Sequence, residues 1–536
     1  MRTLRLQIAA AGLLAVTTSV AGCTSAATAT VASLSGVGPI TFAIGKLDTG
    51  SYLPGLIRQW NAAHPGQRVT LIPLPDEADD QHAQLVANLQ AKSSLYDVIS
   101  LDVIWTAEFA ANGWIVPLNP GSLPLAGLLR PTVATASYQG KLYTVPFTSN
   151  ADLLYYRKDI LAAAGRQPPR TWAQLAELAR TLAPRYGMAG YAGQFAPYEG
   201  LTVNFAEAVQ SAGGSILSPD STRVTLDSPQ ARAGLRFLSS GFRQGWIPRA
   251  ALNYDEATSQ RAFEAGKLLF MNNWPYVYGQ ASSPGTGSKV AGRFGVTMLP
   301  GPDGPGSSSL GGENLAISAF SRHQVTALAF IKFLTSISSE RRILIDASLP
   351  PVWTRLYTDP ALIRRFPYLP VLEKAILTAK PRPGIPNYNQ LSLAISGTIH
   401  QALAAGWPAG PTITALSRKL SSVIRMAGTS PLPGAHARRR GPRTHGSGKA
   451  IACLGGNGPL RTGPLRAAEP SRRLSRPGQA PRPAPAGQAA AGLSRIRQRS
   501  LHAPAGPAAR LSLGRGGAAH SSGGEYIPAR FWRHFL

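Results

Sequence analysis

Cysteine is scarce in this sequence, and its scarcity excludes two ways of stabilising a fold. Two cysteines, Cys23 and Cys453, occur in 536 residues, so neither a disulfide framework nor a cysteine-ligated zinc site can organise the chain. The nine histidines are not spaced as metal ligands are, and no nucleophile-elbow, zinc-protease or Walker motif occurs. We therefore expect no metal, no cofactor and no enzymatic activity.

Acidic residues are also few, 26 against 54 Lys and Arg, and the resulting net charge of +28 is uneven along the chain. The segment 431–536 holds 18 Lys or Arg and two acids, which accounts for 16 of the 28 net charges. Because it has no sustained apolar period, we expect residues 428–536 to form a basic, low-complexity, disordered tail. One explanation is a basic arm for nucleic acid or anionic lipid. We favour the other, GC-rich codons read out of frame, and expect no nucleic-acid partner.

Long hydrophobic runs are missing except near the N-terminus. Two arginines precede an apolar stretch, Leu6–Val20, that is too short to span a bilayer, and the sequence VAGC follows and ends at Cys23. This pattern resembles a bacterial lipobox, in which the cysteine becomes the lipid-modified mature N-terminus. We expect residues 1–22 to be a signal peptide and residues 23–39 a lipid-anchored tether, with an ordinary secretory signal as the alternative. The first interpretation places the protein on the extracellular face of the cytoplasmic membrane.

The segment between residues 40 and 427 has α/β patterning. ITFAIG, RVTLIPL and YDVISLD are short apolar runs typical of strands, and the stretches GSYLPGLIRQWNAAHPG and DDQHAQLVANLQAK have helical periodicity. Strands that alternate with helices predict a parallel sheet covered by helices. This length exceeds what one hydrophobic core usually serves, so we expect two domains. We also expect helix caps at Asp79 or Asp80 and at Thr171.

Five stretches of this segment together resemble one protein family. They are YDVISLDVIW…NGWIVPL, GKLYTVPFTSNADLLYYRKDIL, AFEAGKLLFMNNWPYVY, LGGENLAIS and PRPGIPNYNQLS. In this order they resemble the extracellular sugar-binding proteins of ABC importers, and within that family the trehalose- and maltose-binding proteins. The resemblance implies an α/β, two-lobed periplasmic-binding-protein-like fold with a hinge between the lobes. Lobe 1 would comprise residues 40–148 and 308–350, and lobe 2 residues 149–307 and 351–427.

The same resemblance implies a function and its partners. The protein would capture a disaccharide or short oligosaccharide by lobe closure and deliver it, as a monomer, to a permease with a cytoplasmic ATPase. Ligands of open α/β sheets bind beyond the strand ends, where the loops of this sequence carry polar and aromatic residues. The rival hypothesis is a secreted glycosidase that pairs the carboxylates of Asp102 and Glu199. A nucleic-acid-binding protein, which would rest on the tail alone, is the third.

Several aspartates stand where the predicted strands begin or end. Asp102 ends the run YDVISLD, so we expect its carboxylate to face a ligand or to cap the helix that begins near Trp105. Asp97 begins the same strand and should lie roughly 17 Å away, in a structural role. Asp80, or its neighbour Asp79, follows the second strand and resembles the acidic ligand of the trehalose-binding group, with a helix cap as the alternative.

Polar residues in two later loops extend the predicted site. Asn150 and Asp152 follow VPFTSN, where the family crosses between lobes, and both are short polar groups suited to hydroxyl contacts. Glu199 opens a helix, so the helix dipole alone could explain its position. The resemblance favours instead a role as an acceptor for sugar hydroxyls.

The stretch NNWPYVY is the strongest single candidate for ligand contact. Two amides and three rings around a proline make a poor packed strand, so we expect Trp274 and Tyr276 to present flat faces to sugar rings, with core packing as the alternative. Gly312 and Glu313 open the next strand, where glycine lets backbone approach a ligand closely. Arg382 lies between two prolines and resembles the family's arginine that donates to sugar hydroxyls.

Overall fold

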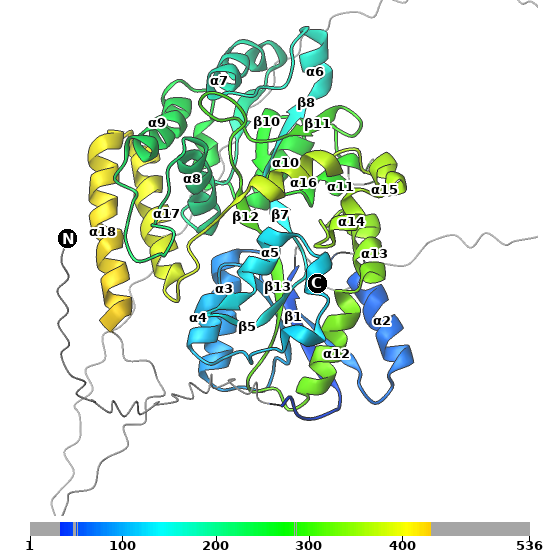
Figure 1. Ribbon diagram of the computed structural model, residues 1–536. Helices are drawn as coiled ribbons and strands as arrows, with labels where there is room; N and C mark the ends of the chain where they lie inside the picture. The colour runs from blue at the N-terminus through cyan, green and yellow to red at the C-terminus, as the bar shows by residue number, and fades with distance from the viewer. Residues whose placement is uncertain (1–32, 47–49, 51, 284, 286, 430–536) are drawn as a thin grey trace, which may run out of the picture. The chain divides into compact units, whose positions relative to one another are not determined.

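The computed structural model in Figure 1 describes one stretch of the chain with four small gaps. The described residues are 33–46, 50, 52–283, 285 and 287–429. The predicted signal peptide, the lipid-attachment residue Cys23 and the basic tail from residue 430 onward lie outside the described residues. Within the described part, no helix combines the length and the apolar character that crossing a membrane requires.

Lobe 1 is built on a five-stranded sheet with the order β2-β1-β3-β13-β6. β1 pairs in parallel with β2 and β3, whereas β13 is antiparallel to β3 and β6. Its strands are β1 (Ile40–Gly45), β2 (Val69–Leu74), β3 (Val98–Asp102), β6 (Thr144–Pro146) and β13 (Glu313–Ile317). Its helices are α2 (Leu53–Ala63), α3 (Ala78–Gln90), α4 (Thr106–Ala111), α5 (Arg130–Thr135), α12 (Gln324–Leu334) and α13 (Ile337–Ala347), and a small hairpin joins β4 (Ser137–Tyr138) to β5 (Lys141–Leu142).

Lobe 2 is built on a four-stranded sheet with the order β11-β8-β10-β9. β10 is antiparallel to β8 and parallel to β9, and β11 is antiparallel to β8. Its strands are β8 (Leu153–Arg157), β9 (Ala189–Ala192), β10 (Leu268–Asn273) and β11 (Phe294–Thr297). Its helices are α6 (Lys158–Ala163), α7 (Trp172–Thr181), α8 (Glu199–Ser211), α9 (Pro229–Arg243), α10 (Glu256–Glu264), α11 (Val277–Ser282), α17 (Tyr388–Ala405) and α18 (Ala409–Thr429).

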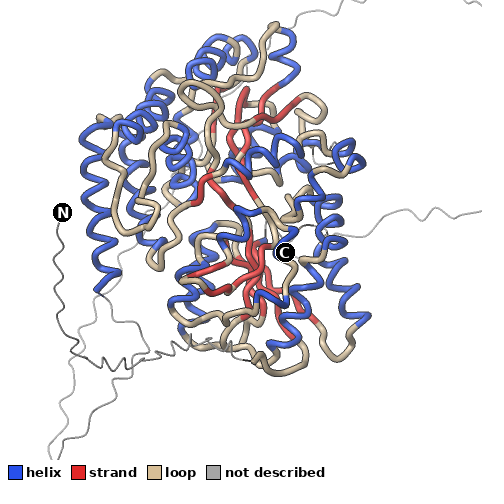
Figure 2. Tube along the Cα trace, in the orientation of Figure 1, coloured by secondary structure: helices blue, strands red, loops and turns tan. Residues whose placement is uncertain are grey.

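A third sheet gathers the segments through which the chain passes from one lobe to the other. It has the order β14-β12-β7, with β7 (Asn150–Ala151), β12 (Ser309–Gly311) and β14 (Lys380–Pro381). In chain order, β7 follows β6 and β12 follows β11. β14 follows three helices, α14 (Thr354–Tyr357), α15 (Pro360–Arg365) and α16 (Leu369–Thr378). Figure 1 and Figure 2 show β7 and β12 between the two larger sheets.

Local sequence explains how two of the helices begin. Thr171 caps α7 as predicted, because its hydroxyl accepts a hydrogen bond from the Gln174 amide while the Gln174 side chain accepts one from the Thr171 amide. The predicted cap of α3 at Asp79 or Asp80 is wrong. Glu77 caps that helix and accepts hydrogen bonds from both aspartate amides, at 3.0 and 3.2 Å. A helix that begins at Ala78 places both aspartates in its first turn.

The predicted structural role of Asp97 is confirmed. Its carboxylate is buried and accepts hydrogen bonds from the Thr41 amide at 2.8 Å and from the Ser321 hydroxyl at 2.5 Å. These bonds tie the start of β3 to β1 and to the turn that follows β13. A buried carboxylate with such partners costs far less than an unpaired one.

Gly312 links β12 to β13 in a conformation that favours glycine. Its φ is +125°, and a Cβ atom built there would lie 2.2 Å from the carbonyl oxygen of Thr148. A side chain would therefore force apart two of the segments that connect the lobes. The close approach that Gly312 permits is to the chain's own backbone, and the predicted approach to a ligand stays a prediction.

Candidate ligand-binding cleft

A cavity of about 110 Å³ lies where the hinge sheet meets both lobes. Lobe 1 and the segments around the hinge sheet contribute Asp76, Ala78, Gln81, Asp102, Asn150, Gly311, Gly312, Glu313, Leu349 and Arg382. Lobe 2 contributes Glu199, Gly200, Val203, Glu256, Trp274 and Tyr276. We call this cavity the cleft.

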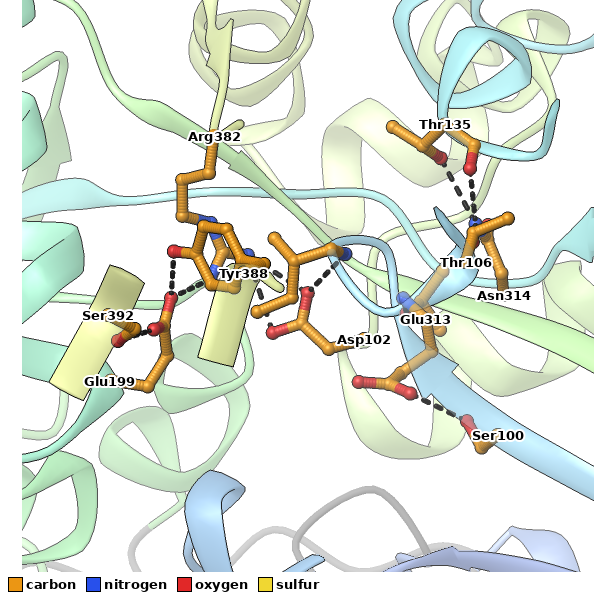
Figure 3. Close-up of polar contacts among 12 residues, drawn as sticks. Ser100, Asp102, Thr106, Thr135, Glu199, Glu313, Asn314, Arg382, Tyr388 and Ser392 are labelled. Carbon is orange, nitrogen blue, oxygen red and sulfur yellow. Dashed lines mark hydrogen bonds and ion pairs between the residues drawn. The ribbon is translucent and has the colours of Figure 1, made fainter. Parts of the chain in front are cut away.

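Arg382 is the central polar residue of the cleft, and it connects the lobes. Its side chain is 1% exposed, and Nη2 donates to both carboxylate oxygens of Asp102, at 2.9 and 3.3 Å. Nη1 donates to Oε1 of Glu199 (Figure 3). Because Asp102 ends a strand of lobe 1 and Glu199 begins a helix of lobe 2, one guanidinium group joins carboxylates from both lobes.

Glu199 is held from several sides. Oε1 also accepts a hydrogen bond from the Tyr388 hydroxyl at 2.7 Å, and Oε2 accepts one from the Ser392 hydroxyl. Both donors lie on α17, and Figure 3 shows them beside the Glu199 carboxylate. Burial raises the pKa of Glu199, and the Arg382 charge opposes that rise. With three side chains donating to its oxygens, Glu199 fixes the direction of the guanidinium group.

Asp102 and Glu313 lie side by side, because Asp102 is the last residue of β3, Glu313 is the first of β13, and the two are paired in register. The Asp102 side chain is 18% exposed, and its Oδ1 also accepts a hydrogen bond from the Ile104 amide at 3.2 Å. Glu313 accepts a hydrogen bond from the Ser100 hydroxyl at 2.7 Å. The N-cap residue of α4 is Trp105 and not Asp102. Of the two roles predicted for Asp102, helix capping is therefore not observed, and ligand contact stays a prediction.

Trp274 and Tyr276 follow β10, where the chain turns into α11. The Trp274 amide donates to Oδ1 of Asn273 at 2.8 Å, and its carbonyl accepts from the Tyr155 hydroxyl at 2.8 Å. Its ring packs over Gly311, where a Cβ atom would lie 2.8 Å from ring carbons. The glycine therefore makes room for the half-buried indole at the wall of the cleft.

The cleft is strongly acidic. Its lining contains five carboxylates, those of Asp76, Asp102, Glu199, Glu256 and Glu313, and Arg382 is the one cation among the described lining residues. Burial raises the pKa of Glu256 to about 7, although the Tyr198 hydroxyl donates a hydrogen bond to its carboxylate. Such a lining offers many acceptors and few donors, which suits a ligand rich in hydroxyl groups.

Eight of the ten predicted ligand residues line the cleft, namely Asp102, Asn150, Glu199, Trp274, Tyr276, Gly312, Glu313 and Arg382. Asp80 does not; it is exposed on the first turn of α3. Asp152 is fully buried, where burial and the neighbouring Glu207 raise its pKa well above the ordinary value. Ligand contact by these two residues stays a prediction without support from their positions.

Sequence reasoning missed three polar residues of the lining, Asp76, Gln81 and Glu256. Asp76 follows β2, so the rule that ligands bind beyond strand ends would have identified it. Gln81 and Glu256 lie in the first turns of α3 and α10, where polar residues are common for helix stability alone. Among the described residues, no three or more His, Cys, Asp or Glu side chains are grouped so that they could hold a metal ion.

Two α/β lobes, three crossing segments and a polar cleft beside them define a two-lobed ligand-binding receptor. The chain belongs to the bacterial extracellular solute-binding protein family, whose model matches residues 45–339. A "Probable ABC transporter-binding protein" of Deinococcus radiodurans is 31% identical over 377 residues, which cover 68% of this chain and 88% of the relative. A mannitol-binding protein of Pseudomonas aeruginosa is 24% identical over 398 residues, 70% of this chain and 90% of the relative.

Solved structures agree with this assignment. Maltose-bound MalE3 of T. maritima has a TM-score of 0.69 and 32% identity, covering 72% of this chain and 99% of that one. The GacH receptor of Streptomyces glaucescens shares the fold, with a TM-score of 0.64, 24% identity and coverage of 73% and 99%. The predicted fold and family are therefore confirmed. The protein is the extracellular solute-binding component of an ABC transporter, a class of binding proteins rather than enzymes.

Proposed function

We propose that this protein captures a disaccharide or short oligosaccharide, of the trehalose or maltose type, outside the cell. It is held at the extracellular face of the cytoplasmic membrane by a lipid on Cys23 and acts as a monomer. It delivers the sugar to permease subunits that are driven by a cytoplasmic ATPase. The maltose-bound neighbour, which is 32% identical, supports this proposal.

The composition of the cleft is the observation that carries the proposal. Asp102 and Glu313 offer carboxylate oxygens to hydroxyl groups at one wall, and Trp274 offers an apolar ring face at another. Asn150 also lines the cleft from the hinge sheet, where it pairs with Gly311, and its buried Oδ1 has no hydrogen-bond partner among the described residues. A hydroxyl donor from a sugar would satisfy this atom.

The roles of the cleft residues follow from their contacts. Arg382 and Glu199 have most of their hydrogen-bonding capacity committed to each other, to Asp102 and to α17. They therefore orient the Asp102 carboxylate, whose remaining lone pairs accept sugar hydroxyls. A glycosidase would need one carboxyl group free to donate a proton. Glu199 is instead surrounded by donors, which disfavours that rival function.

The size of the cleft requires movement of the lobes. Pockets for larger organic ligands are roughly 300–1,000 Å³, so a cavity of about 110 Å³ has to widen before a disaccharide fits. Rotation about the hinge sheet would widen it, because the sheet's strands β7, β12 and β14 connect the lobes. The bound sugar would then gain contacts from both lobes on closure.

A linear polyol is the second candidate ligand. The small cavity favours it, and so does the mannitol-binding relative. Polyols share the hydroxyl pattern of sugars but present no ring face to Trp274.

Thermal denaturation of the full chain with a panel of ligands tests the proposal. A ligand at 100 times its dissociation constant stabilises a protein by about 2.7 kcal/mol, so trehalose or maltose should raise the melting temperature at millimolar concentration. Mannitol, ribitol and glucose should raise it less. Stabilisation by polyols alone would make the disaccharide assignment wrong, and no shift with any compound would contradict sugar binding.

A further inference from the structure

A second and larger cavity also has Arg382 in its lining. Its volume is about 480 Å³, and Arg382 is the one residue that it shares with the cleft. We call it the hinge cavity. Its walls are residues 103, 104, 106 and 107 before and within α4, residues 131, 134, 135 and 137 at α5, residues 210, 215–219 and 221 at and after α8, and residues 310 and 381–384 at the hinge sheet.

The walls of the hinge cavity are largely apolar. Its apolar side chains are Val103, Ile104, Ala107, Pro131, Ala134, Ile216, Leu217, Pro219, Leu310, Pro381 and Pro383. Its described lining has no aromatic ring and no carboxylate, the two features that define the cleft. A cavity of this size and lining fits an organic molecule of roughly drug size, and it is not fitted to a sugar.

Two buried polar atoms among the lining residues have no hydrogen-bond partner among the described residues. One is Nε of Arg382, a residue that is 5% exposed and whose two Nη atoms are committed to Asp102 and Glu199. The other is Oε1 of Gln210. A buried donor without a partner is costly. A ligand oxygen that accepts from Nε would remove that cost.

Charge decides which oxygen fits. The guanidinium group already faces two carboxylates, Asp102 and Glu199, so the local charge of the three groups is −1 when both are ionised. An anionic ligand would meet this excess negative charge in a poorly screened site. A neutral hydroxyl or carbonyl oxygen accepts the same hydrogen bond without that repulsion.

We propose that the hinge cavity is a second small-molecule site, for a neutral and largely apolar compound that carries one hydroxyl or carbonyl group. The oxygen accepts a hydrogen bond from Nε of Arg382, and the apolar body packs against Leu217, Leu310 and Pro131. Because the walls come from lobe 1, lobe 2 and the hinge sheet, the compound contacts all three parts.

The neutral naphthyl ketone dye prodan is a suitable probe, because it is apolar, carries one carbonyl group and fluoresces at shorter wavelength in apolar surroundings. Titrated with the full chain, it should show saturable one-site binding with a blue shift. Its naphthoate analogue, which has a carboxylate in place of the ketone, should bind more weakly. Absence of saturable prodan binding, or tighter binding of the naphthoate, would overturn the proposal.

Three variants locate the probe. Ala134 lines the hinge cavity at an exposed position of α5, so Ala134→Trp adds bulk there with little risk to the fold. It should weaken prodan binding about tenfold or more, which is about 1.4 kcal/mol. Ala162→Trp, at an exposed position of α6, is the matched control, and Trp274→Ala reports on the cleft. Both should leave prodan affinity unchanged. Prodan affinity that is insensitive to Ala134→Trp, or lost in Trp274→Ala, would place the dye elsewhere and refute the site.

Discussion

Replacement of Arg382 by glutamine tests how the cleft is organised. The substitution removes the cation that joins Asp102 and Glu199 and keeps a side chain able to form hydrogen bonds. The side chain of Arg382 is 1% exposed, and those of Asp102 and Glu199 are 18% and 5% exposed. Both would remain in a largely buried site without a positive charge beside them.

The magnitude follows from this burial. Removing one partner of a buried ion pair costs about 3–5 kcal/mol. The Asp102 carboxylate stays partly exposed in the cleft, and Glu199 keeps the hydrogen bonds from Tyr388 and Ser392. We therefore expect a cost at the lower end of this range. With an unfolding entropy of about 2.1 cal/mol/K per residue, a folded part of roughly 390 residues should lose roughly 4 °C of melting temperature. Sugar affinity should fall as well, by about 1.5–3 kcal/mol, because Asp102 is no longer oriented.

The loss of stability in this variant should depend on pH. Without Arg382 the pKa of Glu199, already raised by burial, rises further. A carboxyl group whose pKa is raised in the folded state contributes stability that is present below its unfolded pKa and is lost as pH rises through the folded value. Arg382→Gln should therefore lose more stability at pH 8 than at pH 5.

Calorimetric melting at the two pH values, followed by sugar titration, measures both effects. Arg341→Gln is the matched control, because Arg341 pairs with Asp359 nearer the surface, with side chains 39% and 25% exposed. That substitution should cost no more than about 1 kcal/mol. If Arg382→Gln melts like the control at both pH values, the ion pair does not organise the cleft.

Three further predictions concern charge, pH and localisation. Asp102→Asn should reduce sugar affinity by about 1.5–3 kcal/mol, and the wild type should leave a bound disaccharide intact over hours; release of monosaccharide that this substitution abolishes would make Asp102 catalytic. Burial raises the pKa of Glu207 from 4.5 to about 8, so its contribution to stability is full below about pH 4.5 and is lost as pH rises toward 8. Between pH 5 and pH 8 the melting temperature of the wild type should fall more than that of Glu207→Gln. If the two melting temperatures change equally, titration of Glu207 does not contribute to stability in this range. Cys23→Ser should release the protein from the membrane fraction, and a variant that still sediments with membranes would contradict the lipid anchor.

The fold could be predicted largely from local pattern. Alternation of apolar runs with helical stretches indicated the α/β lobes, and the residues around Thr171 specify a capping box through contacts three residues apart. The misplaced cap of α3 shows the limit of this reasoning. Glu77, Asp79 and Asp80 are all acidic and lie within four residues. Only the position at which the helix begins decides which of them accepts hydrogen bonds from the first backbone amides.

The cleft could be predicted in part, for a physical reason. Asp102 and Glu313 follow from strand ends, which sequence reveals. Asp152 is fully buried, and its raised pKa depends in part on Glu207, 55 positions later. The commitment of Glu199 to Arg382 likewise depends on groups that are distant in sequence. The separation of two residues along the chain does not show that they are in contact in the fold.

Isothermal titration of the full chain with maltose and with trehalose, in the wild type and in Trp274→Ala, tests the central claim most directly. The account predicts saturable binding of at least one disaccharide to the wild type. In Trp274→Ala the affinity should fall by roughly 1–3 kcal/mol while the fold stays largely intact. Trp407→Ala, which alters a residue that is 42% exposed, should bind as the wild type does. Unchanged affinity in Trp274→Ala, or the absence of binding heat with either disaccharide, would contradict sugar capture in this cleft.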